Sequence, residues 1–462
     1  MSEATSLAAQ QLATERIGKL LMQYSVPAII ASVATSLYNI IDSMFIGQGV
    51  GAMAIAGLAI TFPLMNLVIG FCTLVAIGGA TISSIFLGQK NEARATETVN
   101  TVMVLCVLHS VVFGGAAYVF MDEVLTLFGA TANTLPYARE FMSVILLFSP
   151  ISYIFIGLNN IMRATGYPRK AMYSALITVF TNLALAPIFI FSFKWGIGGA
   201  AFATICGQAV GLVWVLAHFM SKKSLVHFNF RVGFFNPQVI KRVYAIGMSP
   251  FLMNTCACFV VVFINKSLLT YAGDFGDTAV GAYGILNRTA MCFVMIVLGV
   301  AQGMQPILGF NFGAGNWPRV KSTLMKGVWA GLGVTMVGAI LAELFPSQLT
   351  RMFTTDPTMI DMATHAYRVY FTVFGVVGPQ IVITNYFQSI GKPKMSIFLS
   401  LTRQLIFLVP LLALLPPKWG VDGIWYSMMG SDVLALAMAL AVLVLGVRKY
   451  NRNYAETTST QA

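Results

Sequence analysis

The stretch that decides the fold is residues 27–57, which read PAIIASVATSLYNIIDSMFIGQGVGAMAIAG. A related stretch returns in the second half of the chain, where residues 250–281 read PFLMNTCACFVVVFINKSLLTYAGDFGDTAVG. Asp42 of the first copy falls opposite Asn265 of the second. A duplicated apolar segment with a carboxylate in only one copy suggests two similar walls around a cavity, with one ion-sensing group in one wall. This arrangement predicts a transporter.

The composition places the chain in a lipid bilayer. Hydrophobic residues make up 57% of the chain, charged residues 10%, and the mean hydropathy is +0.79. Roughly a quarter of the residues of an ordinary soluble domain are charged. Several apolar runs reach the roughly 20 residues that a helix needs to cross hydrocarbon, and none shows the alternation of a barrel strand. We therefore expect an all-α membrane protein.

Apolar runs bounded by Gly, Pro or charged clusters predict twelve transmembrane helices. They cover residues 20–47, 54–86, 98–120, 136–161, 171–193, 197–220, 243–270, 279–310, 322–345, 362–389, 395–416 and 422–447. The predicted organisation is a cytoplasmic N-terminal segment 1–19, a six-helix bundle 20–220, a cytoplasmic loop 221–242, a second six-helix bundle 243–447 and a cytoplasmic tail 448–462.

Basic residues predict the orientation of these helices. If the N-terminus is cytoplasmic, the same side of the membrane carries 20 of the 28 lysines and arginines. These are Arg16, Lys19, Lys90, Arg94, Arg163, Arg169, Lys170, Lys222, Lys223, Arg231, Lys241, Arg242, Arg319, Lys321, Lys326, Lys392, Lys394, Arg448, Lys449 and Arg452. Both termini are therefore expected in the cytoplasm. A basic inner surface facing anionic lipid explains the net charge of +12, so no nucleic-acid partner is predicted.

The repeat predicts how the two halves are related. Gly88 pairs with Gly313, and Trp195-Gly196 with Trp419-Gly420, at almost the same offset along the chain as Pro27 with Pro250. Six helices in each half make both halves begin on the same side of the membrane. The halves should then be related by a pseudo-twofold axis along the membrane normal, with the cavity between them near the midplane.

Only two of the 16 acidic residues, Asp42 and Asp432, lie deep inside predicted spans. A charged side chain at that depth costs at least roughly 2.5 kcal/mol, so each must face the bundle interior, pair with a partner or be protonated. We interpret Asp42 as an ion-coupling residue, with a structurally paired carboxylate as the alternative. The polar residues expected around it are Tyr38 and Asn39, four and three residues earlier on the helix, and Thr178 and Asn182 of the fifth span.

The second half differs because it carries cations at depth. Lys266, Arg288 and Arg403 could form a structural network with Asp432, or a second polar site for an anionic part of the substrate, and the sequence leaves both open. Polar and thioether side chains near the repeat interface are candidates for the substrate cavity. They are Asn66, Met65, Asn254, Met253, Arg288, Met291, Met295 and Asn265.

The sequence argues against enzymatic chemistry. The four histidines are scattered, and there is no HExxH, GxSxG or P-loop motif. The six cysteines lie inside predicted spans without metal-ligand spacing. We therefore expect no metal site and no cofactor other than a coupling ion.

Several motifs together resemble one transporter family. They are YNIID at 38–42, RATG at 163–166, QGMQPI at 302–307, GFNFGA at 309–314 and FQSIGKP at 387–393. In this order, over residues 16–450, they resemble the multidrug and toxic compound extrusion (MATE) family, in its DinF-like and MepA-like bacterial branch. The resemblance implies a pair of six-helix bundles, with Asp42 in the ion-coupling role and Asn182 at the matching polar position.

The same resemblance implies the function. It predicts a monomeric antiporter of the bacterial inner membrane that exports lipophilic, often cationic drugs or toxic metabolites and so supports antibiotic resistance. The alternative is a flippase or exporter of a lipid-linked or polysaccharide precursor. Many relatives carry an Asp before the fifth-span Pro, but this chain has Ala186 before Pro187. The missing carboxylate favours H⁺ over Na⁺ as the coupling ion.

Overall fold

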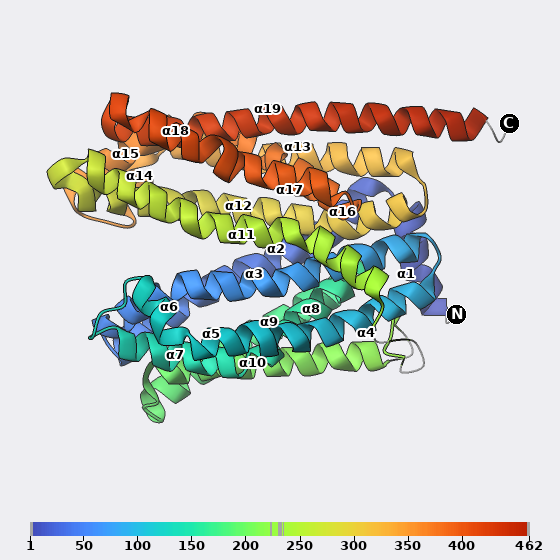
Figure 1. Ribbon diagram of the computed structural model, residues 1–462, viewed down its shortest axis with the longest axis horizontal. Helices are drawn as coiled ribbons and strands as arrows, with labels where there is room; N and C mark the ends of the chain where they lie inside the picture. The colour runs from blue at the N-terminus through green and yellow to red at the C-terminus, as the bar shows by residue number, and fades with distance from the viewer. Residues whose placement is uncertain (1–2, 222–223, 230–232, 234, 460–462) are drawn as a thin grey trace. The chain divides into compact units, whose positions relative to one another are not determined.

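Figure 1 shows the computed structural model of the chain, which describes residues 3–221, 224–229, 233 and 235–459. Its side chains are described for residues 9–51, 53–221, 224–229, 233 and 235–446. The elements in these parts of the chain are helices, without a strand. Lys222, Lys223 and Arg231 of the predicted loop lie outside the described residues, as do the side chains of Arg448, Lys449 and Arg452 in the predicted tail.

The first half of the chain forms α1 to α10. They are α1 (Glu3–Thr14), α2 (Ile17–Gly49), α3 (Ala52–Gly88), α4 (Glu92–His109), η1 (Ser110–Gly114), α5 (Gly115–Val119), α6 (Met121–Leu127), α7 (Leu135–Leu147), α8 (Ser149–Ala164), α9 (Pro168–Pro187), η2 (Ile188–Ser192) and α10 (Gly196–Met220). Local sequence explains several of these starts. The Asn91 side chain accepts a hydrogen bond from the Arg94 amide and caps α4, and a proline occupies the first turn of α7, α8 and α9.

The second half forms α11 to α19. They are α11 (Pro237–Tyr271), η3 (Gly273–Phe275), α12 (Gly276–Gly313), α13 (Trp317–Leu344), α14 (Pro346–Arg351), α15 (Pro357–Phe371), η4 (Phe374–Val376), α16 (Val377–Ser389), α17 (Pro393–Leu401), η5 (Thr402–Leu408), α18 (Val409–Leu414) and α19 (Pro416–Ser459). Asp356 caps α15 by accepting from the Thr358 amide. Figure 1 shows α19 as the red helix that carries the C-terminal end of the chain.

The described helices confirm the twelve predicted spans. Ten of them are long and apolar enough to cross a membrane, and the number rises to twelve if each of two bent pairs is one span. The bent pairs are α7 with α8, at 57°, and α15 with the segment Phe374–Ser389, at 53°. Several helices begin up to six residues before the predicted start, because their first turns are polar and continue beyond the apolar run. Helix α1 was not predicted, because its sequence is too polar to be a span.

Departures from α-helical geometry occur inside three spans. η1, η2 and η5 are π-helical turns. η2 directly follows Pro187, whose ring removes a backbone hydrogen bond of the helix at that point. A π-turn leaves one extra residue in the helix and so changes which side chains face the interior after it.

The backbone repeats in step with the sequence. Three pairs of residues with positive φ occupy equivalent positions of the two copies, at the junction between two helices or, for Gly420, at a kink inside α19. They are Lys90 and Gly315 (58° and 70°), Gly166 and Gly391 (106° and 69°), and Gly196 and Gly420 (56° and 56°). Left-handed φ favours glycine, so the shared backbone shape explains why glycines recur in two of these three pairs, while Lys90 adopts the same φ as a non-glycine residue.

Contacts divide the chain into two compact units. Unit 1 comprises Met1–Thr255, Gln302–Thr323 and Ser389–Pro393, and unit 2 comprises Cys256–Ala301, Leu324–Gln388 and Lys394–Ala462. Three borders fall inside α11, α12 and α13, so each of these helices contributes residues to both units, and the other two fall at the end of α16 and the start of α17. The division of the chain at loop 221–242 stays a prediction from the sequence.

Unit 1 contains the predicted ion-coupling residues and large hydrophobic clusters. One cluster gathers buried side chains of α1, α2, α3, α4 and α8, with Leu12, Leu20, Val75 and Leu158 among them. Another gathers side chains of α2, α3, α7 and α10. The helix that carries Asp42, α2, packs against both α9 and α10.

Candidate functional site

Asp42 is a buried carboxylate without a visible partner. It lies on α2, its exposed fraction is 7%, and its Oδ1 atom is buried without a hydrogen bond among the described residues. The four ion pairs in this part of the chain do not include it. A buried ionised carboxylate that lacks a cation or a donor is costly, so this position favours a protonated or ion-bound state.

Asn182 presents a second buried acceptor on the neighbouring helix α9. Its Nδ2 atom donates to Thr204 Oγ1 of α10 at 3.0 Å, and Thr204 Oγ1 donates to the Ala200 carbonyl at 3.2 Å. Because the Thr204 hydroxyl donates its single hydrogen to that carbonyl, its oxygen can only accept a hydrogen bond from Asn182. The NH2 group of the Asn182 amide must therefore face Thr204. Its Oδ1 is therefore an acceptor, and it is buried without a partner among the described residues.

Asp42 Oδ1 and Asn182 Oδ1 both lack a hydrogen-bond donor among the described residues. Asp42 Oδ1 and Asn182 Oδ1 are both buried acceptors on helices that pack together, α2 and α9. A buried acceptor without a donor costs about 1 to 3 kcal/mol. A proton on the carboxylate would supply a donor, and a small cation would supply a positive charge for such a buried oxygen.

The remaining predicted coupling residues contribute less to such a site. Tyr38 is half-buried, whereas Asn39 is exposed, and its main-chain carbonyl accepts the Ser43 hydroxyl at 2.8 Å. The Thr178 hydroxyl donates to the Ser174 carbonyl of its own helix at 3.0 Å. The structure thus places Asn182 and Thr178 in the buried interior, and Asn39 outside it.

The predicted substrate-cavity residues divide between the two units. Met65, Asn66, Met253 and Asn254 belong to unit 1, and Asn265, Arg288, Met291 and Met295 belong to unit 2. Within unit 1, the Asn254 Cβ atom is 3.8 Å from the point where a Cβ on Gly70 would lie, so α11 approaches α3 beside these residues. In unit 2, Arg288 and Met291 are exposed, and the Asn265 Oδ1 atom is buried without a partner among the described residues. Whether these residues line one cavity stays a prediction.

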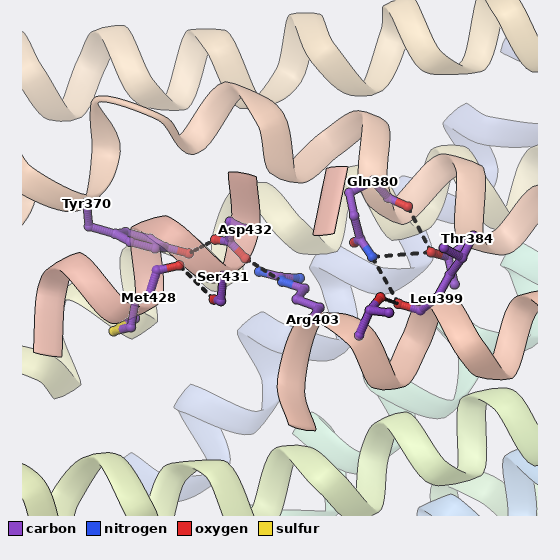
Figure 2. Close-up of polar contacts among 9 residues, drawn as sticks. Tyr370, Gln380, Thr384, Leu399, Arg403, Met428, Ser431 and Asp432 are labelled. Atoms are coloured by element: carbon purple, nitrogen blue, oxygen red, sulfur yellow. Dashed lines mark hydrogen bonds and ion pairs between the residues drawn. The ribbon is translucent and has the colours of Figure 1, made fainter. Parts of the chain in front are cut away.

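The second deep carboxylate, Asp432, has a fully different environment. Figure 2 shows Arg403 of η5 and Tyr370 of α15 pointing toward Asp432 of α19. Arg403 Nε donates to Asp432 Oδ1 at 2.6 Å, and the Tyr370 hydroxyl donates to Asp432 Oδ2 at 3.1 Å. Both oxygens are therefore satisfied, and three spans of unit 2 are joined at one buried point.

The other two deep cations of the second half are not part of this pair. Lys266 and Arg288 are exposed, and neither takes part in the ion pairs of the described residues. Of the four charged residues that the sequence singled out, Arg403 and Asp432 thus form a structural pair, with Tyr370 as a third member that the sequence did not suggest.

Thr204 is the member of the Asp42 region that the sequence analysis missed. It is buried, in the apolar stretch GIGGAAFATICGQ at 196–208. The available signal was a hydroxyl in an otherwise small and apolar helix. A threonine in such a helix usually bonds to its own backbone, as Thr204 also does, so the sequence could not show that it accepts from Asn182.

A family model and known proteins resemble this chain over most of its length. The MatE family model matches residues 27–188 and again 251–414, once in each half of the chain. The chain is 26% identical over 429 residues to the multidrug export protein MepA of Staphylococcus aureus strain MRSA252, covering 92% of this chain and 94% of the relative. It is 24% identical over 428 residues to MepA of Staphylococcus haemolyticus strain JCSC1435, covering 92% and 93%.

Solved structures agree with the fold. The MATE multidrug transporter DinF-BH in complex with rhodamine 6G superimposes with a TM-score of 0.86 at 34% identity, covering 93% of this chain and 96% of that chain. A structure of MATE in the bent conformation gives a TM-score of 0.91 at 20% identity, covering 97% and 99%, which supports the fold alone.

Proposed function

The chain belongs to the MatE family of transporters, and on that premise we propose that it exports lipophilic, often cationic compounds across the bacterial inner membrane in exchange for protons. It is a multi-pass membrane transporter rather than an enzyme. Export of drugs in particular is supported by the multidrug export proteins that it resembles and by the rhodamine 6G complex of DinF-BH. The predicted cytoplasmic position of both termini and of most basic residues belongs to the same proposal.

Asp42 carries the coupling in this proposal. The supporting observation is that Asp42 Oδ1 and Asn182 Oδ1 are buried acceptors without donors among the described residues. Protonation removes the charge of the carboxylate and creates an O–H donor, so it relieves both the cost of the buried charge and the lack of a donor. Loss of the proton restores a negative charge that attracts a cationic substrate. Proton and substrate are thus alternative ways to neutralise one group.

A proton fits the site better than Na⁺ does. A Na⁺ ion is held by several converging oxygens, and Ala186, fully buried, replaces the carboxylate that many relatives place one residue before Pro187. The Thr178 and Thr204 hydroxyls already donate to main-chain carbonyls of their own helices. Groups of three or more His, Cys, Asp or Glu that could hold a metal ion do not occur among the described residues.

Coupling requires that protonation favours one conformation of the transporter. A ligand that binds both states equally shifts nothing, and moving an equilibrium from 1:99 to 99:1 takes about 5.5 kcal/mol of differential binding. Protonation at Asp42 contributes to this difference only if the carboxylate is more exposed to water in the other state. The protonated site then favours substrate release to the outside, and proton release to the cytoplasm resets the cycle.

Purified protein in liposomes tests this function. Rhodamine 6G, the compound bound by DinF-BH, serves as the transported probe. We expect transport of this probe under an imposed pH gradient in Na⁺-free buffer, and no stimulation by a Na⁺ gradient at equal pH. Transport that stays absent under the pH gradient and starts under a Na⁺ gradient alone would reject proton coupling. Failure to transport any cationic probe under either gradient would reject drug export itself.

A further inference from the structure

Residues 302–323 of the second half pack inside unit 1 rather than unit 2. The border within α12 falls between Ala301 and Gln302, and Pro306 follows within the same helix. Proline has no amide hydrogen, so the Gln302 carbonyl loses its normal i+4 donor at this point. The packing partner of α12 therefore changes where its backbone hydrogen bonding is interrupted, which is where helices bend most readily.

The helix backbones of α3 and α12 meet closely and reciprocally. A Cβ on Gly88 would lie 1.9 Å from the Phe310 carbonyl oxygen, and a Cβ on Gly313 would lie 2.1 Å from the Ile85 carbonyl oxygen. Both pairs, Gly88 with Gly313 and Ile85 with Phe310, are equivalent positions of the repeat. The two copies thus contact each other through the same residues, as at a local twofold axis. Only glycine permits this approach.

Polar contacts join the same segments next to this crossing. Gln305 Nε2 donates to Thr81 Oγ1 of α3 at 2.8 Å. The Arg163 guanidinium of α8 donates to Gln302 Oε1 and to Asn160 Oδ1, both at 2.5 Å. No carboxylate pairs with Arg163 among the described residues, so its charge is held by two neutral amides. Neutral acceptors bind a guanidinium less strongly than a carboxylate does, which makes this contact easier to break.

Helix α1 is also hydrogen-bonded to residues 302–323. Arg319 Nη2 donates to the main-chain carbonyls of Leu12 and Glu15, at 3.1 and 2.7 Å, and Arg319 Nε donates to Asn311 Oδ1 at 3.0 Å. Asn311 Nδ2 in turn donates to the Leu12 carbonyl at 3.2 Å. The Leu12 side chain is fully buried in the cluster that also includes Ile307. Carbonyls at a helix end lack partners in their own helix, and Arg319 supplies them.

We propose that residues 302–323 and helix α1 form a releasable gate at the end of unit 1 where Gly88 meets Gly313, with its hinge at Gln302 to Pro306. Two features make the contact easy to separate: few side chains interlock where Gly88 crosses α12, and the hydrogen-bond acceptors are uncharged. Two features allow α12 to bend there: Pro306 lies near the border between the units, and α12 continues into unit 2. Arg319 latches α1 to the gate. The predicted orientation puts this gate on the cytoplasmic side. The gate depends on neither the coupling ion nor the substrate of the proposed transport.

Hydrogen–deuterium exchange of the full-length protein in detergent or nanodiscs tests the crossing. Gly88→Ala puts a methyl group against the Phe310 carbonyl and should hold the gate open. We expect about tenfold faster exchange or more in residues 302–313 and in α1, with α9 and α10 unchanged. Gly115→Ala is the matched control, because a Cβ there meets no atom within 4 Å. Equal exchange in Gly88→Ala and Gly115→Ala would overturn the proposal, and so would faster exchange in every helix.

Arg319 variants test the latch and decide the question if Gly88→Ala does not fold. Arg319→Ala should raise exchange in α1 and in residues 302–313, and Arg319→Lys should give at most a partial recovery, because an ammonium lacks the planar fork that reaches Asn311 and two carbonyls together. Unchanged exchange in α1 for Arg319→Ala would overturn the latch. These readouts need no substrate, so failure of the gate is separable from failure of the transport function.

Discussion

Replacement of Asp42 by Asn should abolish gradient-driven transport while leaving the fold intact. The change removes the titratable group but keeps the size and planarity of the side chain. The equivalent position of the repeat already carries an amide, Asn265. An amide also supplies the N–H donor that the buried oxygens of Asp42 and Asn182 lack among the described residues, so it mimics the protonated carboxyl permanently.

Two magnitudes follow for this variant. Providing a donor to a buried acceptor is worth about 1 kcal/mol, so the free energy of unfolding should stay equal or rise slightly. A pH difference of about 2 units supplies about 2.7 kcal/mol per proton. At one proton per substrate and zero membrane potential, this sustains a roughly 100-fold substrate gradient. Without the titrating group, the sustained gradient should fall to one.

The assay compares accumulation ratios of rhodamine 6G in proteoliposomes with thermal unfolding of the same preparations. Ser43→Ala is the matched control, because the Ser43 hydroxyl donates only to the Asn39 carbonyl of its own helix. We expect Ser43→Ala to sustain the wild-type gradient. If Asp42→Asn sustains a gradient close to that of the wild type, Asp42 is not the coupling group. If it unfolds several kcal/mol more easily, its carboxylate is a structural partner, contrary to our interpretation.

Three other substitutions test neighbouring parts of the argument. Asn265→Asp adds a second deep carboxylate at a cost of a few kcal/mol, so we expect poorer expression and an unchanged number of ions per substrate. A measured increase in that number would contradict the interpretation that only the first half of the chain couples transport to an ion. Arg403→Ala leaves Asp432 buried without its cation and should lower the free energy of unfolding by about 3 to 5 kcal/mol. The double variant Arg403→Met with Asp432→Leu should recover most of this loss. An unchanged free energy of unfolding in Arg403→Ala would show that the pair is not structural. Thr204→Val removes the acceptor of Asn182 Nδ2 and should cost about 1 to 3 kcal/mol and weaken pH-driven transport, and no change in either quantity would remove Thr204 from the site.

The fold was largely predictable because hydrocarbon imposes simple requirements. Each span must be long, apolar and helical, and glycines and prolines separate the spans, so the twelve runs appear in the sequence directly. The repeat was equally visible, since turns such as those at Gly166 and Gly391 require a left-handed backbone in both copies. Helix α1 escaped prediction because it is short and polar, and nothing in the sequence indicates that Arg319 donates to the Leu12 and Glu15 carbonyls at its end.

The site was predictable only in part. Asp42 stood out because an acidic residue at depth is expensive. The partners of a deep residue, in contrast, depend on helix rotation and packing, which the sequence does not determine. Asp42 and Asp432 look alike in sequence, yet among the described residues one has a buried oxygen without a donor and the other is paired with Arg403 and Tyr370. Thr204 was missed for the same reason.

The most direct test of proton coupling at Asp42 is proton release during substrate binding. Purified protein in weakly buffered, Na⁺-free detergent solution, near the pH at which transport is half-maximal, is mixed with rhodamine 6G while a pH indicator records the protons released. Competition between proton and substrate for Asp42 predicts release of up to one proton per bound rhodamine by the wild type and by Ser43→Ala, and none by Asp42→Asn. Rhodamine binding by the wild type without proton release, or equal release by Asp42→Asn, would contradict the account.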